Sequence, residues 1–282
     1  MSSGDCVYAL RKLLQERRIG HGGTLDPAAI GVLPIAVGPM TRLLNYLPTG
    51  KAYRATIRFG LTTATDDLEG EVLTESPVVD LTQADIEAQL SAFCGDILQV
   101  PPIYSAIHKD GQRLYDLARQ GNAPTLEELT PRQVRIESLI LREWRSGAYP
   151  EAVIDVECST GTYIRSIARD LGVKLGCGGT LAHLERTRSG QFRREHSISL
   201  AAIKQELEAK TFQLIGPDVA LSHLPKCTLD DQQFAFWKNG RAFPWGSEEN
   251  IVQVWSPEHQ FVGIGKVKDE VLSPVVVLLP EF

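Results

Sequence analysis

The spacing of apolar and polar residues predicts a chain that mixes strands and helices. From Tyr53 to Phe59 every second residue is apolar, and Glu151 to Cys158 alternates in the same way, so both stretches predict half-buried strands. Apolar residues at helical spacing predict amphipathic helices at about residues 5–18, 82–93, 160–175 and 199–210. The short apolar run from Ile30 to Val37 predicts a buried segment.

The C-terminal part of the chain shows a different pattern. Residues 217–225 are typical of a linker, and a short helix at 230–237, a turn at Asn239-Gly240 and strands at 251–255, 261–267 and 275–279 follow it. A length of 282 residues also favours one large domain and one small domain. We therefore expect a small β-rich C-terminal domain.

The stretch His21-Gly22-Gly23-Thr24-Leu25-Asp26-Pro27 has a composition that is typical of a loop at a functional site. The adjacent glycines let the backbone pass close to other groups, and Pro27 restricts Asp26 to an extended conformation. One carboxylate thus lies on a stiff loop ahead of a buried run. The local chemistry supports a catalytic acid and a turn-closing aspartate about equally.

Composition excludes several classes of function. Hydrophobic residues make up 43% of the chain and charged residues 23%, no stretch is apolar and long enough to span a bilayer, and the N-terminus lacks the pattern of a secretory signal. We expect a cytoplasmic protein. The five cysteines have no C-x-x-C spacing and the histidines no ligand spacing, so we expect neither disulfides nor a metal site. The glycines at 176–180 lack the order of a nucleotide-binding loop, so we expect no nucleotide cofactor.

The net charge of −6 is unusual for a protein that binds nucleic acid. The basic residues are nevertheless concentrated in a few places: Arg11, Lys12, Arg17, Arg18, Arg113, Arg119, Arg132, Arg135, Arg142, Arg145 and residues 186–194. This distribution allows a basic face on an acidic protein, and a well-mixed solvated surface is the alternative.

The sequences of five segments closely resemble motifs of the TruB family of tRNA pseudouridine synthases. These segments are His21 to Pro34, Lys51 to Tyr53, Gly60 to Gly70 with Thr63, Thr65 and Asp67, Pro101 to Tyr115, and Gly161 to Ser166. They occur in the family's order and cover roughly residues 5–190.

The resemblance implies an α+β pseudouridine synthase fold, with a mixed, mainly antiparallel central sheet flanked by helices. It implies a catalytic domain at residues 1–216, with an RNA-contacting excursion at about 100–131, and a PUA-like RNA-binding domain at 225–282. The alternative for residues 225–282 is a β cap that covers the core. Family members begin with a further strand of the form Gly-hydrophobic-Lys-Pro, where this chain has Met1-Ser2-Ser3-Gly4. Either that strand is missing or the start is placed too late.

The resemblance also assigns roles. Asp26 matches the catalytic nucleophile, and the residues that match substrate-binding positions are His21, Tyr53, Tyr163, Arg165 and Leu184. Without the resemblance, Tyr53 and Leu184 are typical core residues, Arg165 a surface residue of a helix, and His21 a residue that braces its loop. With it, Tyr53 stacks on a flipped base and is a candidate for removing the proton from C5, Arg165 pairs with Asp26, and Leu184 lines the base pocket. His21 then fills the space that the flipped base leaves in the stack.

The implied function is conversion of uridine 55 in the T-loop of tRNA to pseudouridine by a monomer without cofactors, with the tRNA T-arm as partner. Two other classes remain open. A non-catalytic tRNA-binding or tRNA-folding protein has no need of the set Asp26, Tyr53 and Arg165. A glycosidase-type hydrolase normally uses two cooperating carboxylates, and the key loop holds one.

Overall fold

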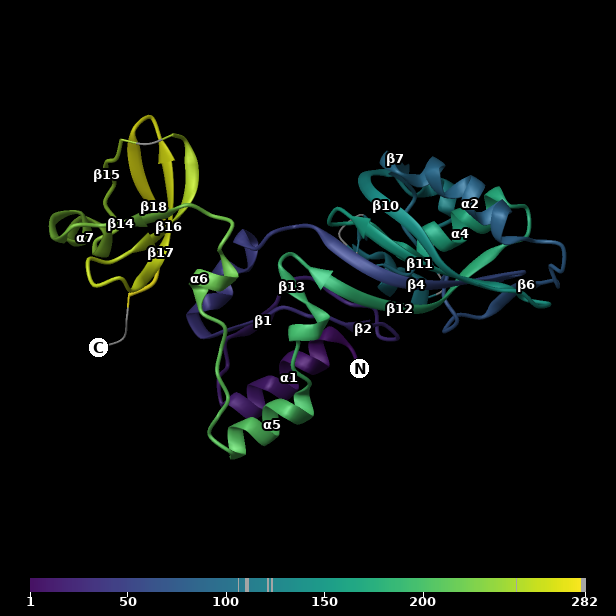
Figure 1. Ribbon diagram of the computed structural model, residues 1–282, viewed down its shortest axis with the longest axis horizontal. Helices are drawn as coiled ribbons and strands as arrows, with labels where there is room; N and C mark the ends of the chain where they lie inside the picture. Colours follow the sequence, from purple (N-terminus) through teal and green to yellow (C-terminus); the bar gives the residue numbers. More distant parts are fainter. Residues whose placement is uncertain (106, 110–111, 121, 123, 247, 280–282) are drawn as a thin grey trace. The chain divides into compact units, whose positions relative to one another are not determined.

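The computed structural model describes residues 1–105, 107–109, 112–120, 122, 124–246 and 248–279, and its chain contacts divide into two compact units (Figure 1). The first unit comprises residues 1, 25–32 and 49–197, and the second comprises residues 2–24, 33–48 and 198–282. Among the described residues, no helix combines the length and hydropathy needed to cross a membrane. Ala106 and Gly111 of the Pro101–Tyr115 segment lie outside the described residues, as do the side chains of Arg113, Tyr115 and Arg119.

A seven-stranded sheet organises the described part of the first unit. Its strands run in the order β13 (Phe192–Arg193), β12 (Gly179–Ser189), β4 (Lys51–Phe59), β11 (Glu151–Cys158), β10 (Arg132–Arg145) and β7 (Gly95–Gln99), and β2 (Ile30–Gly31) pairs with β12. The β2–β12 pair is parallel and the other pairs are antiparallel. The predicted α+β class with a mixed, mainly antiparallel sheet is confirmed.

Helices α2 (Gln83–Leu90) and α4 (Ile164–Lys174) cover the same face of this sheet (Figure 1). Tyr53, Ala55, Ile57 and Phe59 of β4 point to that face and are at most 8% exposed, as the alternation predicts. The apolar stripes of the two helices meet them in one core. The remaining elements of the unit are short: β5 (Leu61–Thr63), β6 (Val72–Glu75), η2 (Ser91–Phe93), β8 (His108–Lys109), β9 (Gln112–Arg113), α3 (Leu114–Arg119), η3 (Leu126–Glu128) and η4 (Arg194–His196).

The glycines at residues 172–179 serve packing. A side chain at Gly172 would place its Cβ 2.1 Å from the backbone nitrogen of Gly179, and one at Gly179 would meet the carbonyl oxygen of Ala168 at 2.6 Å. The run that could suggest a nucleotide loop therefore lets α4 lie directly against the start of β12. Helix α4 begins at Ile164, later than predicted, because Gly161 turns the chain at φ 92°.

The N-terminal and middle parts of the second unit are mainly helical. The helices of these parts are α1 (Ser3–Leu14), η1 (Gly38–Tyr46), α5 (Leu200–Glu208) and α6 (Pro217–Ala220). Strand β1 (Ile19–His21) pairs antiparallel with β3 (Ile35–Val37). Val7 and Leu10 of α1 pack with Ile203 of α5 in a small core. A capping box formed by Ser2 and Asp5 starts α1.

The C-terminal part of the second unit is the expected β-rich domain. Its five-stranded sheet has the order β14 (Lys226–Thr228), β16 (Asn250–Trp255), β17 (Phe261–Lys268), β18 (Val271–Val277) and β15 (Phe243–Pro244), and α7 (Asp231–Lys238) packs near it. Trp237 of α7 is fully buried, and its indole nitrogen donates to the carbonyl oxygen of Val262 at 3.0 Å. The expected boundary between residues 216 and 225 does not coincide with the two compact units, and it stays a prediction about independent domains.

The chain that follows Asp26 is fastened to β12 at one point. Gly31 lies against Arg186 with φ 111°, and a Cβ there would come within 2.2 Å of the Arg186 carbonyl oxygen. That oxygen accepts a hydrogen bond from Val32 N at 2.9 Å, and Arg186 Nε donates to Val32 O at 2.7 Å. Only glycine fits this close approach.

We predict that Gly31→Ala lowers the free energy of unfolding by more than about 1 kcal/mol, because alanine disfavours the positive φ and collides with β12. Gly147→Ala is the matched control: nothing lies within 4 Å of its Cβ position, and we expect a change within about 0.5 kcal/mol. Urea unfolding measures both. Equal stabilities of the two variants would contradict the anchoring.

Candidate active site

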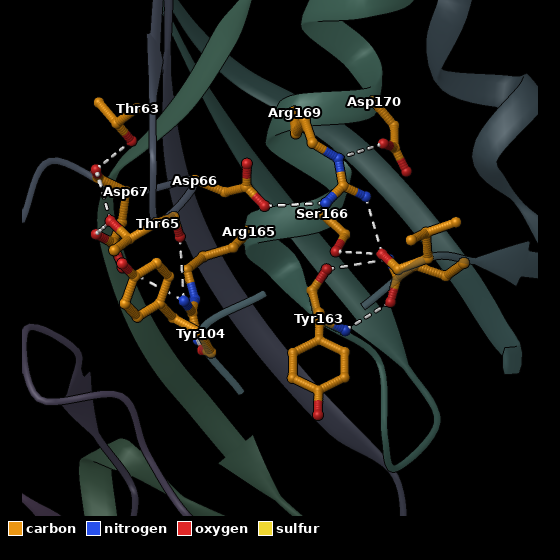
Figure 2. A network of polar contacts seen from close by, with 12 residues as sticks. Thr63, Thr65, Asp66, Asp67, Tyr104, Tyr163, Arg165, Ser166, Arg169 and Asp170 are labelled. Carbon is orange, nitrogen blue, oxygen red and sulfur yellow. Dashed lines mark hydrogen bonds and ion pairs between the residues drawn. The ribbon is translucent and has the colours of Figure 1, made fainter. Parts of the chain in front are cut away.

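Arg165 lies at the start of α4 with its side chain only 7% exposed. Its Nη1 donates to the Thr65 carbonyl oxygen at 3.1 Å and its Nη2 to the Tyr104 carbonyl oxygen at 3.0 Å. Figure 2 shows the guanidinium between these two segments. The expectation of a solvated surface arginine is therefore wrong, because the helix turns this side chain into the protein, where backbone oxygens fix its plane.

Asp26 is the carboxylate that faces the Nε and Nη2 atoms of this guanidinium. Arg165 Nη2 donates to Asp26 Oδ1 at 3.3 Å, and Arg165 Nε lies 2.9 Å from Oδ2 as an ion pair without hydrogen-bond alignment. The Asp26 side chain is 39% exposed. The carboxylate is thus held from one side and open on another, as a nucleophile must be.

A second carboxylate, Asp67, also approaches Arg165. Its Oδ2 is 3.8 Å from Arg165 Nη1, and its Oδ1 accepts hydrogen bonds from the Thr65 hydroxyl and from Glu69 N. Asp67 is 14% exposed and its acceptor sites face the protein. It therefore balances the guanidinium charge and is poorly placed for the acid–base role that a glycosidase mechanism requires. Sequence reasoning gave Asp67 no role, and its place in the Gly60–Gly70 segment was the available signal.

Tyr53 and Leu184 lie on adjacent strands of the same core. Leu184 pairs in register with Ala55, two residues from Tyr53, and both side chains are 8% exposed. Burial raises the pKa of Tyr53 to about 12, Arg186 opposes the rise through its charge and a hydrogen bond, and Cys158 and Asp26 add to it. The phenol is therefore neutral at physiological pH. Arg186, a fully buried arginine opposite Tyr53 in the sheet, is a further residue that sequence reasoning missed.

Tyr163 is the residue that precedes α4. Its backbone N–H donates to Gln99 Oε1 at 2.8 Å, and its carbonyl oxygen accepts from Gln99 Nε2 at 3.0 Å. Its ring points away from the polar network around Arg165 (Figure 2). The main chain of Tyr163 is thus fixed, and its half-buried ring is available to a ligand.

His21 belongs to the other compact unit and ends strand β1 there. It pairs in register with Ile35, and the next residue, Gly22, donates to the Pro34 carbonyl oxygen at 2.8 Å. Within the described residues, His21 Nδ1 is buried without a hydrogen-bond partner. The strand braces the backbone of His21, but it leaves this ring nitrogen for a ligand or a water molecule.

Several arginines of the expected basic face are paired with acids. Arg135 lies 3.0 Å from Asp96, Arg142 lies 2.7 Å from Asp155, and Arg145 pairs with Glu143 and Glu151. The three arginine side chains are more than half exposed, and such surface ion pairs contribute little stability. The described residues also hold no cluster of three or more His, Cys, Asp or Glu that could bind a metal ion.

Family models match almost the whole chain. The model described as "TruB family pseudouridylate synthase (N terminal domain)" matches residues 11–164, "tRNA pseudouridylate synthase B C-terminal domain" matches 165–217, and "Pseudouridine synthase II TruB, C-terminal" matches 225–278. The tRNA pseudouridine synthase B of Gloeobacter violaceus is 53% identical over 99% of this chain and 95% of its own length. That of Trichormus variabilis is 47% identical over the same shares.

Solved structures show the same fold. The structure "Crystal Structure of a Cbf5-Nop10-Gar1 Complex" matches with a TM-score of 0.73 and 25% identity, over 99% of this chain and 82% of that chain. A second, of an H/ACA RNP bound to a substrate RNA, matches with a TM-score of 0.71 and 22% identity over the same shares, and at that identity it shows the fold alone.

We predict that the Tyr53 phenol stays protonated up to about pH 11, because burial raises its pKa to about 12 from an ordinary value of 10.0. Because the pKa of Tyr53 is higher in the folded than in the unfolded protein, the phenol contributes to the free energy of unfolding. This contribution is complete below pH 10 and is lost as the pH rises toward 12. The measurement is the ultraviolet phenolate difference between the wild type and Tyr53→Phe during a pH titration. A Tyr53 transition at or below pH 10 would contradict the buried, neutral phenol.

Proposed function

Because the chain belongs to the TruB family of pseudouridylate synthases, we propose that it converts uridine 55 in the T-loop of tRNA to pseudouridine with Asp26 as nucleophile. The observation that carries this proposal is the pair of Asp26 and Arg165. A partly exposed carboxylate on a buried guanidinium is a charged nucleophile whose counterion does not block its open side.

The reaction is an isomerisation and needs no second substrate. The N1–C1′ bond breaks, the uracil turns, C5 bonds to C1′, C5 loses its proton, and N1 gains one. The reaction needs a nucleophile at C1′ or C6, or a base for a glycal route, and we propose Asp26 for whichever of these roles applies. Arg165 orients Asp26 and balances its negative charge through the contacts at 2.9 and 3.3 Å.

The other residues handle the base. A base inside a folded loop must leave its stack before it can react. We propose that Tyr53 stacks on the flipped uracil, that Leu184 forms an apolar wall beside it, and that Tyr163 adds a second aromatic surface. The raised pKa of Tyr53 favours stacking over proton removal, because a neutral phenol is a weak base at physiological pH. His21 is proposed to fill the space that the base leaves.

The partner is the T-arm of tRNA, with the C-terminal domain at residues 225–282 as an additional RNA-binding module. Exposed cations lie over aromatic rings in this domain: Lys226 over Trp255 at 4.8 Å and Arg241 over Phe236 at 5.2 Å. Such pairs suit stacking on single-stranded nucleotides near a phosphate backbone. The alternative, a tRNA-binding protein without catalysis, shares this surface and has no use for the Asp26–Arg165 pair.

We predict that the purified chain converts an unmodified tRNA transcript at uridine 55 and converts an isolated T-arm hairpin as well. Pseudouridine-specific carbodiimide labelling followed by primer extension locates the product, and a transcript with cytidine at position 55 is the control. Labelling at another uridine would overturn the assigned position. Binding of tRNA without any labelled product would favour the non-catalytic alternative.

A further inference from the structure

Helix α4 carries two arginines one turn apart, the buried Arg165 and the largely buried Arg169, and both bridge the same two segments (Figure 2). One segment is the turn at residues 63–67, and the other is the stretch at residues 99–104. Arg165 binds the carbonyl oxygens of Thr65 and Tyr104, as described above. Neither the sequence nor the proposed reaction gives Arg169 a task.

The contacts of Arg169 repeat those of Arg165. Its Nη1 lies 3.0 Å from Asp66 Oδ2 in the turn, and its Nη2 donates to the Val100 carbonyl oxygen at 2.8 Å in the other segment. Its Nε donates to Asp170 Oδ1 at 2.9 Å, and its side chain is 11% exposed. The Ser166 hydroxyl donates to the same Val100 oxygen at 2.8 Å. The guanidinium groups of Arg165 and Arg169 thus each bind both segments.

The Asp66–Arg169 pair is a poor source of stability. Burial raises the pKa of Asp66, and although Arg169 and Arg165 lower it, the desolvation of the carboxylate is the largest effect. Asp66 also adopts a left-handed conformation at φ 61°, which is unfavourable for a residue other than glycine. In some proteins a buried ion pair imposes a specific geometry while it adds little net stability.

We propose that Arg169, together with Asp66, is a positioning residue for the reaction at Asp26. The pair holds the strained turn and Val100 against α4, so the acceptors of Arg165 on both sides stay in place. Asp67 follows Asp66 directly, and Thr65 precedes it, so a shift of Asp66 moves two partners of Arg165 at once. A displaced Arg165 guanidinium loses its contacts with Asp26. This inference rests on the proposed function.

The decisive variant removes both charges, Asp66→Asn with Arg169→Met, so that no buried charge is left unpaired. We expect the single-turnover rate on tRNA to fall at least about 30-fold, because small misplacements of catalytic groups have large effects. We expect the tRNA dissociation constant to stay within about threefold and the melting temperature within about 4 °C. A purely structural pair predicts the opposite, a loss of stability with the rate of the folded fraction unchanged.

Two further variants separate charge from geometry. Arg169→Lys keeps a cation beside Asp66 but cannot also reach Val100, so we expect an intermediate loss of about tenfold in rate at near-native stability. The matched control is Arg58→Met, which removes an ion pair of 2.8 Å with Glu151 on the other face of the sheet and leaves Glu151 paired with Arg145. We expect its rate within about twofold of the wild type. If the charge-free double variant does not fold, Arg169→Lys alone decides the question.

A readout without RNA distinguishes this inference from the proposed function. The Nε–Hε NMR signal of Arg165, assigned by its loss in Arg165→Lys, should shift and exchange faster with water in the Asp66/Arg169 variants and stay unchanged in the control. A wild type that forms no pseudouridine would refute the proposed function, and this signal would still test the positioning. An unchanged signal, or a rate within about threefold of the wild type, would overturn the inference.

Discussion

The site depends on one buried cation. Arg165 is almost fully withdrawn from water and holds two carbonyl oxygens and two carboxylates around a single guanidinium. A guanidinium in such a place needs partners on every side, and its planar fork gives each partner a fixed direction. Asp26 is more exposed than Asp67, so it is the carboxylate that a ligand can reach. One side chain therefore positions the proposed nucleophile and balances its charge.

Two close backbone contacts in the fold determine where this cation and Asp26 lie. Close packing of Gly172 against Gly179 brings α4 onto β12, and this contact determines where the first turn of α4 lies. The chain after Asp26 meets the same strand at Gly31, where a Cβ would collide with Arg186. Two glycine-dependent contacts thus bring Asp26 and Arg165 together although 139 positions separate them in sequence. Arg186 links this arrangement to Tyr53 across the sheet.

Local patterns predicted the elements whose apolar residues alternate cleanly, such as β4, β11 and the capped helix α2. Strand β12 was not predicted, because Thr180 and Arg186 are buried and bulges interrupt its alternation. Asp26 stood out through its loop, and Arg165 only through a family resemblance. The roles of Asp66, Asp67 and Arg169 could not be read from the sequence, because their partners are supplied by tertiary packing over about 100 positions.

The most direct test of this account is a comparison of chemistry and binding in Asp26→Asn, which keeps the shape of the side chain and deletes its charge. Single-turnover conversion of tRNA and a filter-binding titration are measured on the same preparation. The account predicts a rate at least about a thousandfold below the wild type. It also predicts a dissociation constant within about tenfold of the wild type, or roughly 1.4 kcal/mol, because most contacts to the RNA lie elsewhere. Pseudouridine formation by Asp26→Asn at a near wild-type rate would contradict the assignment of the nucleophile.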